Sequence, residues 1–204
     1  GVKVFVIQIS GLILFMSSNI VISHVLNPAE VTPYQIAYRY FGIMSMLFAI
    51  IASPLWSATT DAYTIGDWKW INRMMRKMNY LLVCFLFISV AMVAFASIFY
   101  HLWVGDKVDV SLQLSILMAV YTFGLVVSNC YSSILFGIGK IRLMMRMAVI
   151  EVIAFIPVQF YVCREFGVYG LVTVLILVTV ITGYVNYLQF KKISTNTAKG
   201  IWNM

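Results

Sequence analysis

The sequence predicts an all-α integral membrane protein in which six transmembrane helices form one bundle. The first observation is composition: of 204 residues, 62% are hydrophobic and 10% charged, against about 45–50% and about 25% in a soluble domain. The second is the length of the apolar runs, several of which reach the roughly 20 residues that cross a bilayer. Segments 81–100 and 168–190 contain no Asp, Glu, Lys or Arg. Because lipid offers the backbone no hydrogen-bond partner, runs of this length must be helices.

The third observation is the distribution of Lys and Arg between successive loops. If the first span starts in the cytoplasm, eleven of them fall on the cytoplasmic side and three on the other. The eleven are Lys3, Lys69, Arg73, Arg76, Lys77, Lys140, Arg142, Arg146, Lys191, Lys192 and Lys199, and the three are Arg39, Lys107 and Arg164. Since positive residues collect in cytoplasmic loops, both chain ends are predicted to be cytoplasmic. The net charge of +7 follows from this asymmetry, and it indicates anionic lipid headgroups rather than nucleic acid as partners.

The six spans are expected to form one membrane lobe over residues 1–190, followed by a cytoplasmic tail at 191–204. They are predicted at about 2–26, 33–60, 80–104, 110–138, 147–163 and 168–190. The chain begins with Gly1 rather than Met and enters a span almost at once. We therefore expect it to be the later part of a longer protein.

The first span carries polar and small residues along one helical face. Gln8, Gly11, Phe15, Asn19 and Ser23 recur at spacings of three and four, which places them on the same side of a helix. One interpretation is close packing and hydrogen bonding between neighbouring helices. The other is that this face lines a hydrated cavity, for which Gln8 and Asn19 are the candidate residues.

The second span begins after a short turn at 27–33 and opens with aromatic and polar residues. Tyr34 and Tyr38 continue the candidate cavity face. Arg39 lies about a turn and a half below the outer end of this span. Its long side chain either reaches back to the headgroups or faces a central cavity, where it would attract an anionic substrate.

A helix lying in the inner membrane interface is predicted at about 67–79, between the second and third spans. Gly66 ends the preceding helix, and the carboxylate of Asp67 is suited to capping the next one. In the new helix Trp68, Ile71 and three methionines share one side, while Lys and Arg residues lie mostly on the other. This pattern is typical of an interfacial helix.

The later half of the fourth span is a second polar stretch at membrane depth. Asn129 and Ser132 are its candidate site residues, within a run that also holds other hydroxyl residues and Gly137. Two interpretations are open again. The stretch either permits close helix packing or forms a cavity wall together with Gln8 and Asn19.

The fifth span contains the acidic residue Glu151 just inside its cytoplasmic end. An unpaired carboxylate is costly at this depth. Glu151 is therefore expected either to pair with Arg142 or Arg146, or to be protonated part of the time and couple transport to a proton or ion.

No pattern of catalytic or metal-binding residues is found. The three cysteines are far apart, the two histidines lie near the outer interface, and neither a phosphate-binding loop nor a hydrolase motif occurs. We predict a protein that is not an enzyme and that uses no metal or cofactor. Transport is favoured by elimination.

Several segments, taken in order, resemble the later half of a bacterial polysaccharide flippase. This is the O-antigen or Wzx-type group of the multidrug/oligosaccharidyl-lipid/polysaccharide exporter superfamily. The segments are 8–11, 18–19, 33–41, 54–58, 66–67, 70–71 and 198–203.

The resemblance implies one lobe of a MATE-like, two-lobed transporter that works by alternating access, with the N-terminal lobe as its partner. The family moves an undecaprenyl-diphosphate-linked oligosaccharide from the cytoplasmic to the periplasmic leaflet of the bacterial inner membrane, for surface polysaccharide such as O-antigen. The resemblance also implies that Arg39 engages the diphosphate in the cavity. Arg142 and Arg146 would meet the headgroup at the inner mouth.

Two other functions are alternatives to flipping. The first is a Na⁺- or H⁺-coupled multidrug exporter of the same superfamily, for which Glu151 is the acidic candidate. The second is a membrane glycan polymerase or ligase, which ranks lower because no large periplasmic loop occurs in this chain.

Overall fold

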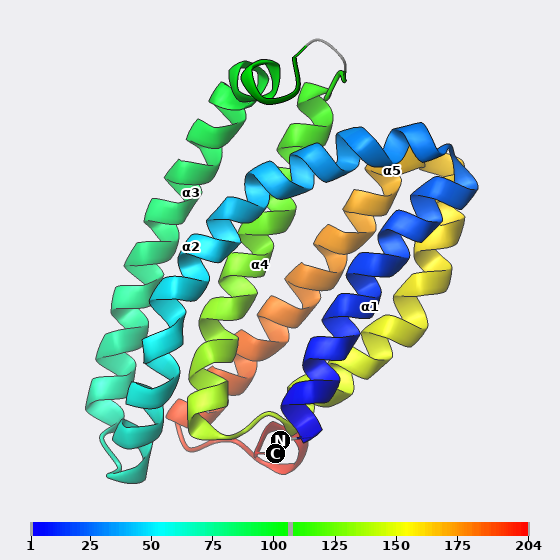
Figure 1. Cartoon of the computed structure of the whole chain (residues 1–204). Helices are drawn as coiled ribbons and strands as arrows, with labels where there is room; N and C mark the ends of the chain where they lie inside the picture. Colours follow the sequence, from blue (N-terminus) through cyan, green and yellow to red (C-terminus); the bar gives the residue numbers. More distant parts are fainter. Residues whose placement is uncertain (1, 106–107, 204) are drawn as a thin grey trace.

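The computed structural model describes residues 2–105 and 108–203, and every long element in these ranges is an α-helix (Figure 1). Five helices of the described chain are long and apolar enough to cross a membrane. In order they are α1 (Val2–Val25), α2 (Val31–Thr64), α3 (Trp68–Val104), α4 (Leu112–Ile138) and α5 (Arg142–Ser194). Two short 3-10 turns, η1 (Pro28–Glu30) and η3 (Gly200–Asn203), accompany them. The all-helical membrane fold is confirmed, with five helices in place of the predicted six.

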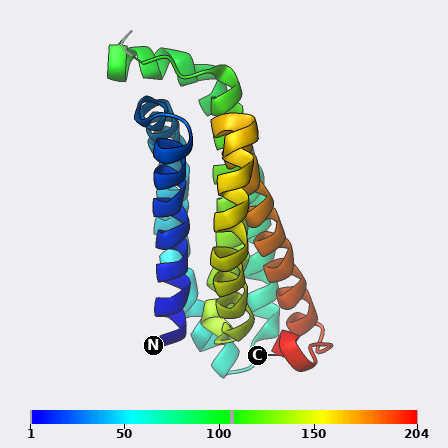
Figure 2. The same ribbon diagram turned by 90° about the vertical axis from the view of Figure 1, so that its right-hand side faces the viewer.

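Both ends of the chain lie at the same end of the bundle, which we call the near end (Figures 1 and 2). The α1–α2 connection at η1 and the bend of α5 lie at the opposite, far end. The most extensive contacts between helices are those of α2 with α4, α4 with α5, and α1 with α5. The near end therefore holds both chain termini, whereas the far end holds the α1–α2 connection and the bend of α5.

The difference in helix number comes from α5, which contains both of the last two predicted spans. A continuous α-helix of 53 residues would be about 80 Å long, far more than one bilayer crossing requires. Inside α5, however, Gly167 has a φ of 65° and a ψ of −156°, which glycine adopts readily. The ribbon turns back at the far end near this residue (Figure 1). We call 142–166 the first arm of α5 and 168–194 its second arm.

The predicted interfacial helix at 67–79 is not a separate element, because α3 continues from Trp68 to Val104 without interruption. The physical reason is that no Gly or Pro occurs between these two residues, so nothing breaks the backbone hydrogen bonding. The predicted cap is present: the backbone N–H of Trp70 donates to the Asp67 carboxylate over 2.9 Å. The start of this helix was therefore predicted correctly, but its division into two was wrong.

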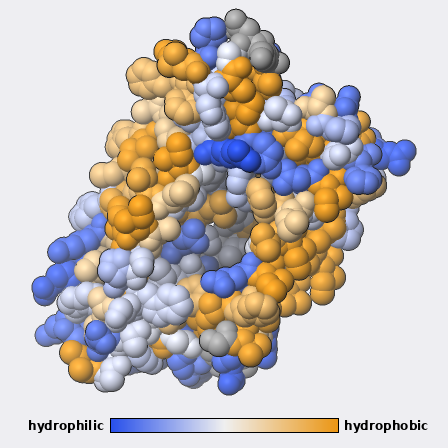
Figure 3. Space-filling view, in the orientation of Figure 1, coloured by the Kyte–Doolittle hydropathy of each residue, from blue (hydrophilic) through white to orange (hydrophobic). Residues whose placement is uncertain are grey.

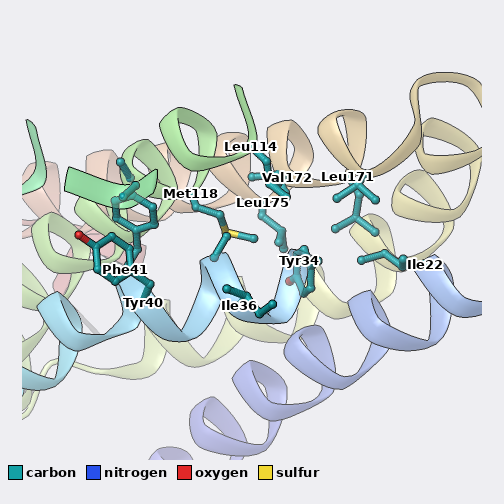
Figure 4. Packing of buried hydrophobic residues seen from close by; sticks show 14 of the residues in the cluster. Ile22, Tyr34, Ile36, Tyr40, Phe41, Leu114, Met118, Leu171, Val172 and Leu175 are labelled. Carbon is teal, nitrogen blue, oxygen red and sulfur yellow. The ribbon is translucent and has the colours of Figure 1, made fainter. Parts of the chain in front are cut away.

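Two clusters of buried hydrophobic residues form the core. The far cluster takes buried residues from all five helices, among them Ile22, Tyr34 and Leu171. Figure 4 shows Met118 and Leu175 pointing toward Tyr34, and Ile22 toward Leu171. The near cluster takes its buried residues from α2, α3, α4 and α5, and includes none from α1. The helices are thus joined tightly at the far end, while at the near end α1 contributes only the partly buried Ile7.

Close packing between α2 and α4 depends on Gly137. A Cβ atom added there would lie 2.6 Å from Thr59 Cβ and 2.9 Å from the backbone oxygen of Trp56. The Thr60 hydroxyl lies 3.0 Å from the Gly137 carbonyl oxygen, within hydrogen-bonding distance. Small residues permit this approach of two helices in a membrane.

The predicted tail at 191–204 is partly helical and folds back on the near end. The helix α5 continues to Ser194, and η3 then packs against it. The Lys140 ammonium donates to the Asn203 carbonyl oxygen over 3.1 Å, and Lys192 Nζ lies 4.0 Å from the centroid of the Trp202 ring. The segment after α5 is therefore attached to the bundle.

Candidate functional site

A cavity of about 330 Å³ lies between α1, α2, α4 and α5. Most of its wall is apolar, but half of its lining residues are polar, and we call it the polar cavity. The face of the molecule seen in Figure 3 is hollowed near its centre, with hydrophilic residues at the edge of the hollow. Next to the near cluster, α1 contributes only the partly buried Ile7, and this residue also lines the cavity. Its polar lining residues are Ser10, Tyr38, Tyr121, Ser128, Asn129, Ser132, Glu151, Thr179, Thr182 and Asn186.

Helical periodicity brings these polar residues to one space. On α4 the lining includes Asn129 and Ser132, which are three residues apart, and on the second arm of α5 it includes Thr179, Thr182 and Asn186, at spacings of three and four. Residues at such spacings lie on one side of a helix. The polar stretch of α4 that the sequence singled out therefore faces the cavity.

Glu151 is 8% exposed and lines the cavity from the first arm of α5. The Thr182 hydroxyl, on the second arm, donates to its carboxylate. The ion pair expected with Arg142 or Arg146 is not formed among the described residues. The reason is geometric: residues five apart differ by about 140° around a helix, and residues nine apart by about 180°. Both arginines are exposed at the near end and do not line the cavity.

The back wall of the cavity is fixed by contacts between α4 and the second arm of α5. Asn186 Nδ2 donates to Ser128 Oγ over 3.4 Å. A Cβ atom on Gly124 would lie 2.8 Å from Thr179 Oγ1, so the two helices approach closely. The sequence prediction missed Thr182 and Asn186 as site residues, although their regular spacing in an otherwise aliphatic span was a signal for them.

Aromatic rings close the far end of the cavity. Phe15 and Tyr38 have ring centroids 4.8 Å apart, Tyr34 and Tyr38 are 6.2 Å apart, and Tyr38 and Tyr121 are 6.5 Å apart. We call these four residues the aromatic cluster. Tyr38 and Tyr121 line the cavity, whereas Tyr34 is 1% exposed and belongs to the far cluster of the core. Tyr34 therefore supports the cavity wall from behind.

Gln8 and Asn19 lie beside the cavity face of α1 and do not line it. Gln8 follows the lining residue Ile7 directly, which turns it by about 100° around the helix. Asn19 Nδ2 donates to the Phe15 carbonyl oxygen over 3.1 Å, and Asn19 Oδ1 accepts from Gln35 on α2. Asn19 therefore forms a hydrogen bond between helices α1 and α2, which agrees with the first of the two interpretations of this helical face.

A second pocket, of about 360 Å³, contains Arg39. It shares Tyr38 and Leu125 with the polar cavity, so the two spaces are neighbours separated by these side chains. Arg39 itself is exposed, and the hydroxyl of Ser45 in the same pocket is buried without a hydrogen-bond partner in the described chain. Arg39 therefore lies next to the polar cavity, whereas one of its two interpretations, and the family resemblance, had placed it within a cavity.

The fold and the cavity define a multi-pass helical membrane protein with a polar space inside an otherwise apolar bundle. Comparison with known proteins identifies its family. The MatE family profile matches residues 4–161, more than half of the chain, and the chain belongs to the MatE family. This confirms the superfamily resemblance drawn from the sequence.

A relative among curated proteins is the "Putative O-antigen transporter" of Salmonella typhimurium (strain LT2). The two sequences are 21% identical over 182 residues, which cover 85% of this chain and 41% of the relative. The chain therefore spans about two fifths of the length of this relative. No solved structure matches the chain.

Proposed function

We propose that this chain is one lobe of a flippase for a polyprenyl-diphosphate-linked oligosaccharide. The lipid-linked sugar would pass from the cytoplasmic to the periplasmic leaflet of a bacterial inner membrane, where surface polysaccharide is assembled. The observation that carries this proposal is the polar cavity, hollowed into one face of an apolar bundle. Sugars and a diphosphate do not cross hydrocarbon unaided, because burying unpaired polar and charged groups is costly. The O-antigen transporter named above suggests the substrate class.

The size of the cavity supports a two-lobed arrangement. A volume of about 330 Å³ is at the lower limit of the roughly 300–1,000 Å³ of small-molecule sites, and it is too small for several sugar units. A second lobe set against the hollowed face would enlarge the space. With its two arms of α5 counted separately, the chain would cross the membrane six times, as one repeat of such a transporter does. The basic residues near both termini favour a cytoplasmic near end.

The proposed residue roles follow from chemistry and position. Asn129 and Ser132, in the cavity, are suited to hydrogen bonding with sugar hydroxyls. Arg39, in the adjoining pocket, would bind the diphosphate, since guanidinium groups pair with phosphate through two parallel hydrogen bonds. Arg142 and Arg146 are exposed at the near end of α5 and would meet the headgroup as it enters.

The test is a deletion of the complete gene in the bacterium that encodes it, with complementation by variants. We expect finished lipid-linked oligosaccharide to accumulate on the cytoplasmic face of the inner membrane, and surface polysaccharide to be lost. Arg39→Ala should fail to complement at normal protein abundance, while the exposed control Arg164→Ala should complement. Normal surface polysaccharide in the deletion strain would refute the flippase assignment.

A second candidate is an ion-coupled multidrug exporter, which is favoured by the burial of Glu151 in the cavity. A carboxylate inside a membrane protein is a candidate for binding a proton or Na⁺. In this case deletion would cause drug sensitivity with unchanged surface polysaccharide. Glu151→Gln would then abolish ion-driven drug export.

A further inference from the structure

The far end of the bundle holds a larger pocket of about 750 Å³, built from three separate parts of the chain. It lies where the α1–α2 connection, the start of α4 and the bend of α5 meet. Its lining residues are Val25, Leu26, Asn27, Glu30, Pro33, Asp109, Ser111, Leu114, Phe166, Gly167, Val168 and Tyr169. We call it the far pocket.

The far pocket is separated from the polar cavity by packed core. The two spaces share no lining residue. Between them lie Tyr34 and the other residues of the far cluster, and Leu114 and Val168 belong both to this cluster and to the wall of the far pocket. In Figure 4 Leu114 lies beside Val172 and Leu175, above Tyr34. The far pocket is thus a distinct site on the opposite side of a closed barrier.

Its lining combines exposed aromatic rings with acidic and amide groups. Phe166 is 68% exposed and directly precedes the bend of α5, whereas Tyr169 is 38% exposed and follows it. The hydroxyls of Tyr169 and Ser111 are 3.0 Å apart, which ties the tyrosine ring to the start of α4. The carboxylates of Glu30 and Asp109 come from two other segments. The position of the rings depends on Gly167, whose positive φ makes the turn between them.

The carboxylates and aromatic rings of the far pocket suit a ligand that carries hydroxyl groups on a ring. Among the described residues that line the pocket none is Lys or Arg, and two carry carboxylates, so this part of the lining disfavours a phosphate. Carboxylates accept hydrogen bonds from hydroxyl groups, and these charge-assisted bonds are stronger than neutral ones. Aromatic faces cover the apolar side of a ring-shaped ligand. A concave site with apolar walls and a few polar groups fits a small, hydroxyl-rich ring.

We propose that the far pocket binds sugar units of a neutral or amine-bearing oligosaccharide. That the ligand is this glycan rests on the proposed flippase function, in which the far end faces the periplasm, where the glycan arrives. The pocket then holds the glycan after it has passed the barrier, and opposes its return while the core closes.

The test uses the full-length protein in lipid nanodiscs. The probe is the mixture of oligosaccharides released by mild acid from the lipid-linked precursors of the encoding bacterium, and binding is measured by saturation-transfer NMR and titration calorimetry. We expect Asp109→Asn to weaken the apparent affinity at least about tenfold, the typical effect of losing one charge-assisted hydrogen bond. Phe166→Ala should also weaken it, by roughly tenfold, because the ring that covers the apolar side of the sugar is lost. Binding should be unchanged in Phe160→Ala and Glu165→Gln, which alter an exposed ring and an exposed carboxylate outside the pocket.

Two results would overturn the far pocket as a sugar site: no binding of these oligosaccharides, or equal affinity in the pocket variants and the controls. The outcome is separable from that of the proposed function. Flipping without sugar binding at the far pocket would refute this site and leave the flippase assignment in place. Sugar binding that depends on Phe166 and Asp109, in a protein that does not flip lipid-linked sugar, would retain the site and refute the flippase.

Discussion

Replacing Gly137 with alanine tests whether close contact between α2 and α4 stabilises the fold. The new Cβ would lie 2.6 Å from Thr59 Cβ and 2.8 Å from Thr59 Cγ2, and 2.9 Å from the Trp56 backbone oxygen. Carbon atoms in contact are about 3.5–4.0 Å apart, so the helices must separate by roughly 1 Å. A side-chain rotation cannot remove the contact with backbone.

The expected loss of stability is about 2 kcal/mol. Overpacking of this kind costs about 1–3 kcal/mol, and the upper part of this range applies because backbone is involved. The hydrogen bond from Thr60 to the Gly137 carbonyl adds about 0.6 kcal/mol, the mean for polar contacts inside membranes. Because alanine has a higher helix propensity than glycine, the substitution also stabilises the helix by about 1 kcal/mol. For a chain of this size the melting temperature should fall by roughly 4–8 °C.

The assay is thermal unfolding of the purified protein in nanodiscs, followed by tryptophan fluorescence. The matched control is Gly11→Ala on α1, where an added Cβ meets no atom within 4 Å. This variant should unfold at the same temperature as the unmodified protein or slightly above it. If Gly137→Ala were as stable as Gly11→Ala, the helix contact inferred at Gly137 would be refuted.

Two further predictions concern single contacts. Thr182→Val removes the hydroxyl that donates to Glu151, which should cost about 1 kcal/mol of stability and lower the melting temperature by about 2–4 °C. The control Thr173→Val changes an exposed threonine and should leave the melting temperature unchanged. Equal melting curves for these two variants would contradict a role for the contact with Glu151. Trp202→Ala removes the ring of the cation–π pair that holds η3 against α5, so trypsin should cut faster after Lys199. An unchanged cleavage rate, measured by mass spectrometry, would show that η3 does not depend on this ring.

Local features were predicted well because they depend on neighbours in the sequence. The long apolar runs required helices, and the capping role of Asp67 followed from its place before the amphipathic segment. The separate interfacial helix was wrong for a related reason. Its amphipathic pattern describes which environment each side prefers, but it does not interrupt the backbone hydrogen bonding, and α3 contains no Gly or Pro that would do so.

Part of the cavity wall could be predicted from the sequence. Periodicity placed Asn129 and Ser132 on one face of α4, and both line the cavity, while their role in binding stays a prediction. The same reasoning on α1 selected Gln8 and Asn19, which lie to one side of it. Periodicity says which residues share a face, but it does not say which helix that face meets. The hydrogen bond between Asn19 and Gln35 joins residues whose partnership depends on how α1 and α2 cross.

By itself, the sequence determined that this chain is a multi-pass membrane protein and where most of its helices lie. These properties follow from the transfer of each residue between water and lipid, which is a local quantity. Only the tertiary structure decided that α1 adds no buried residue to the near cluster, that Thr182 rather than an arginine meets Glu151, and that three distant segments form the far pocket. The physical reason is that contacts and cavities depend on how helices cross, which is set by packing among residues far apart in the chain.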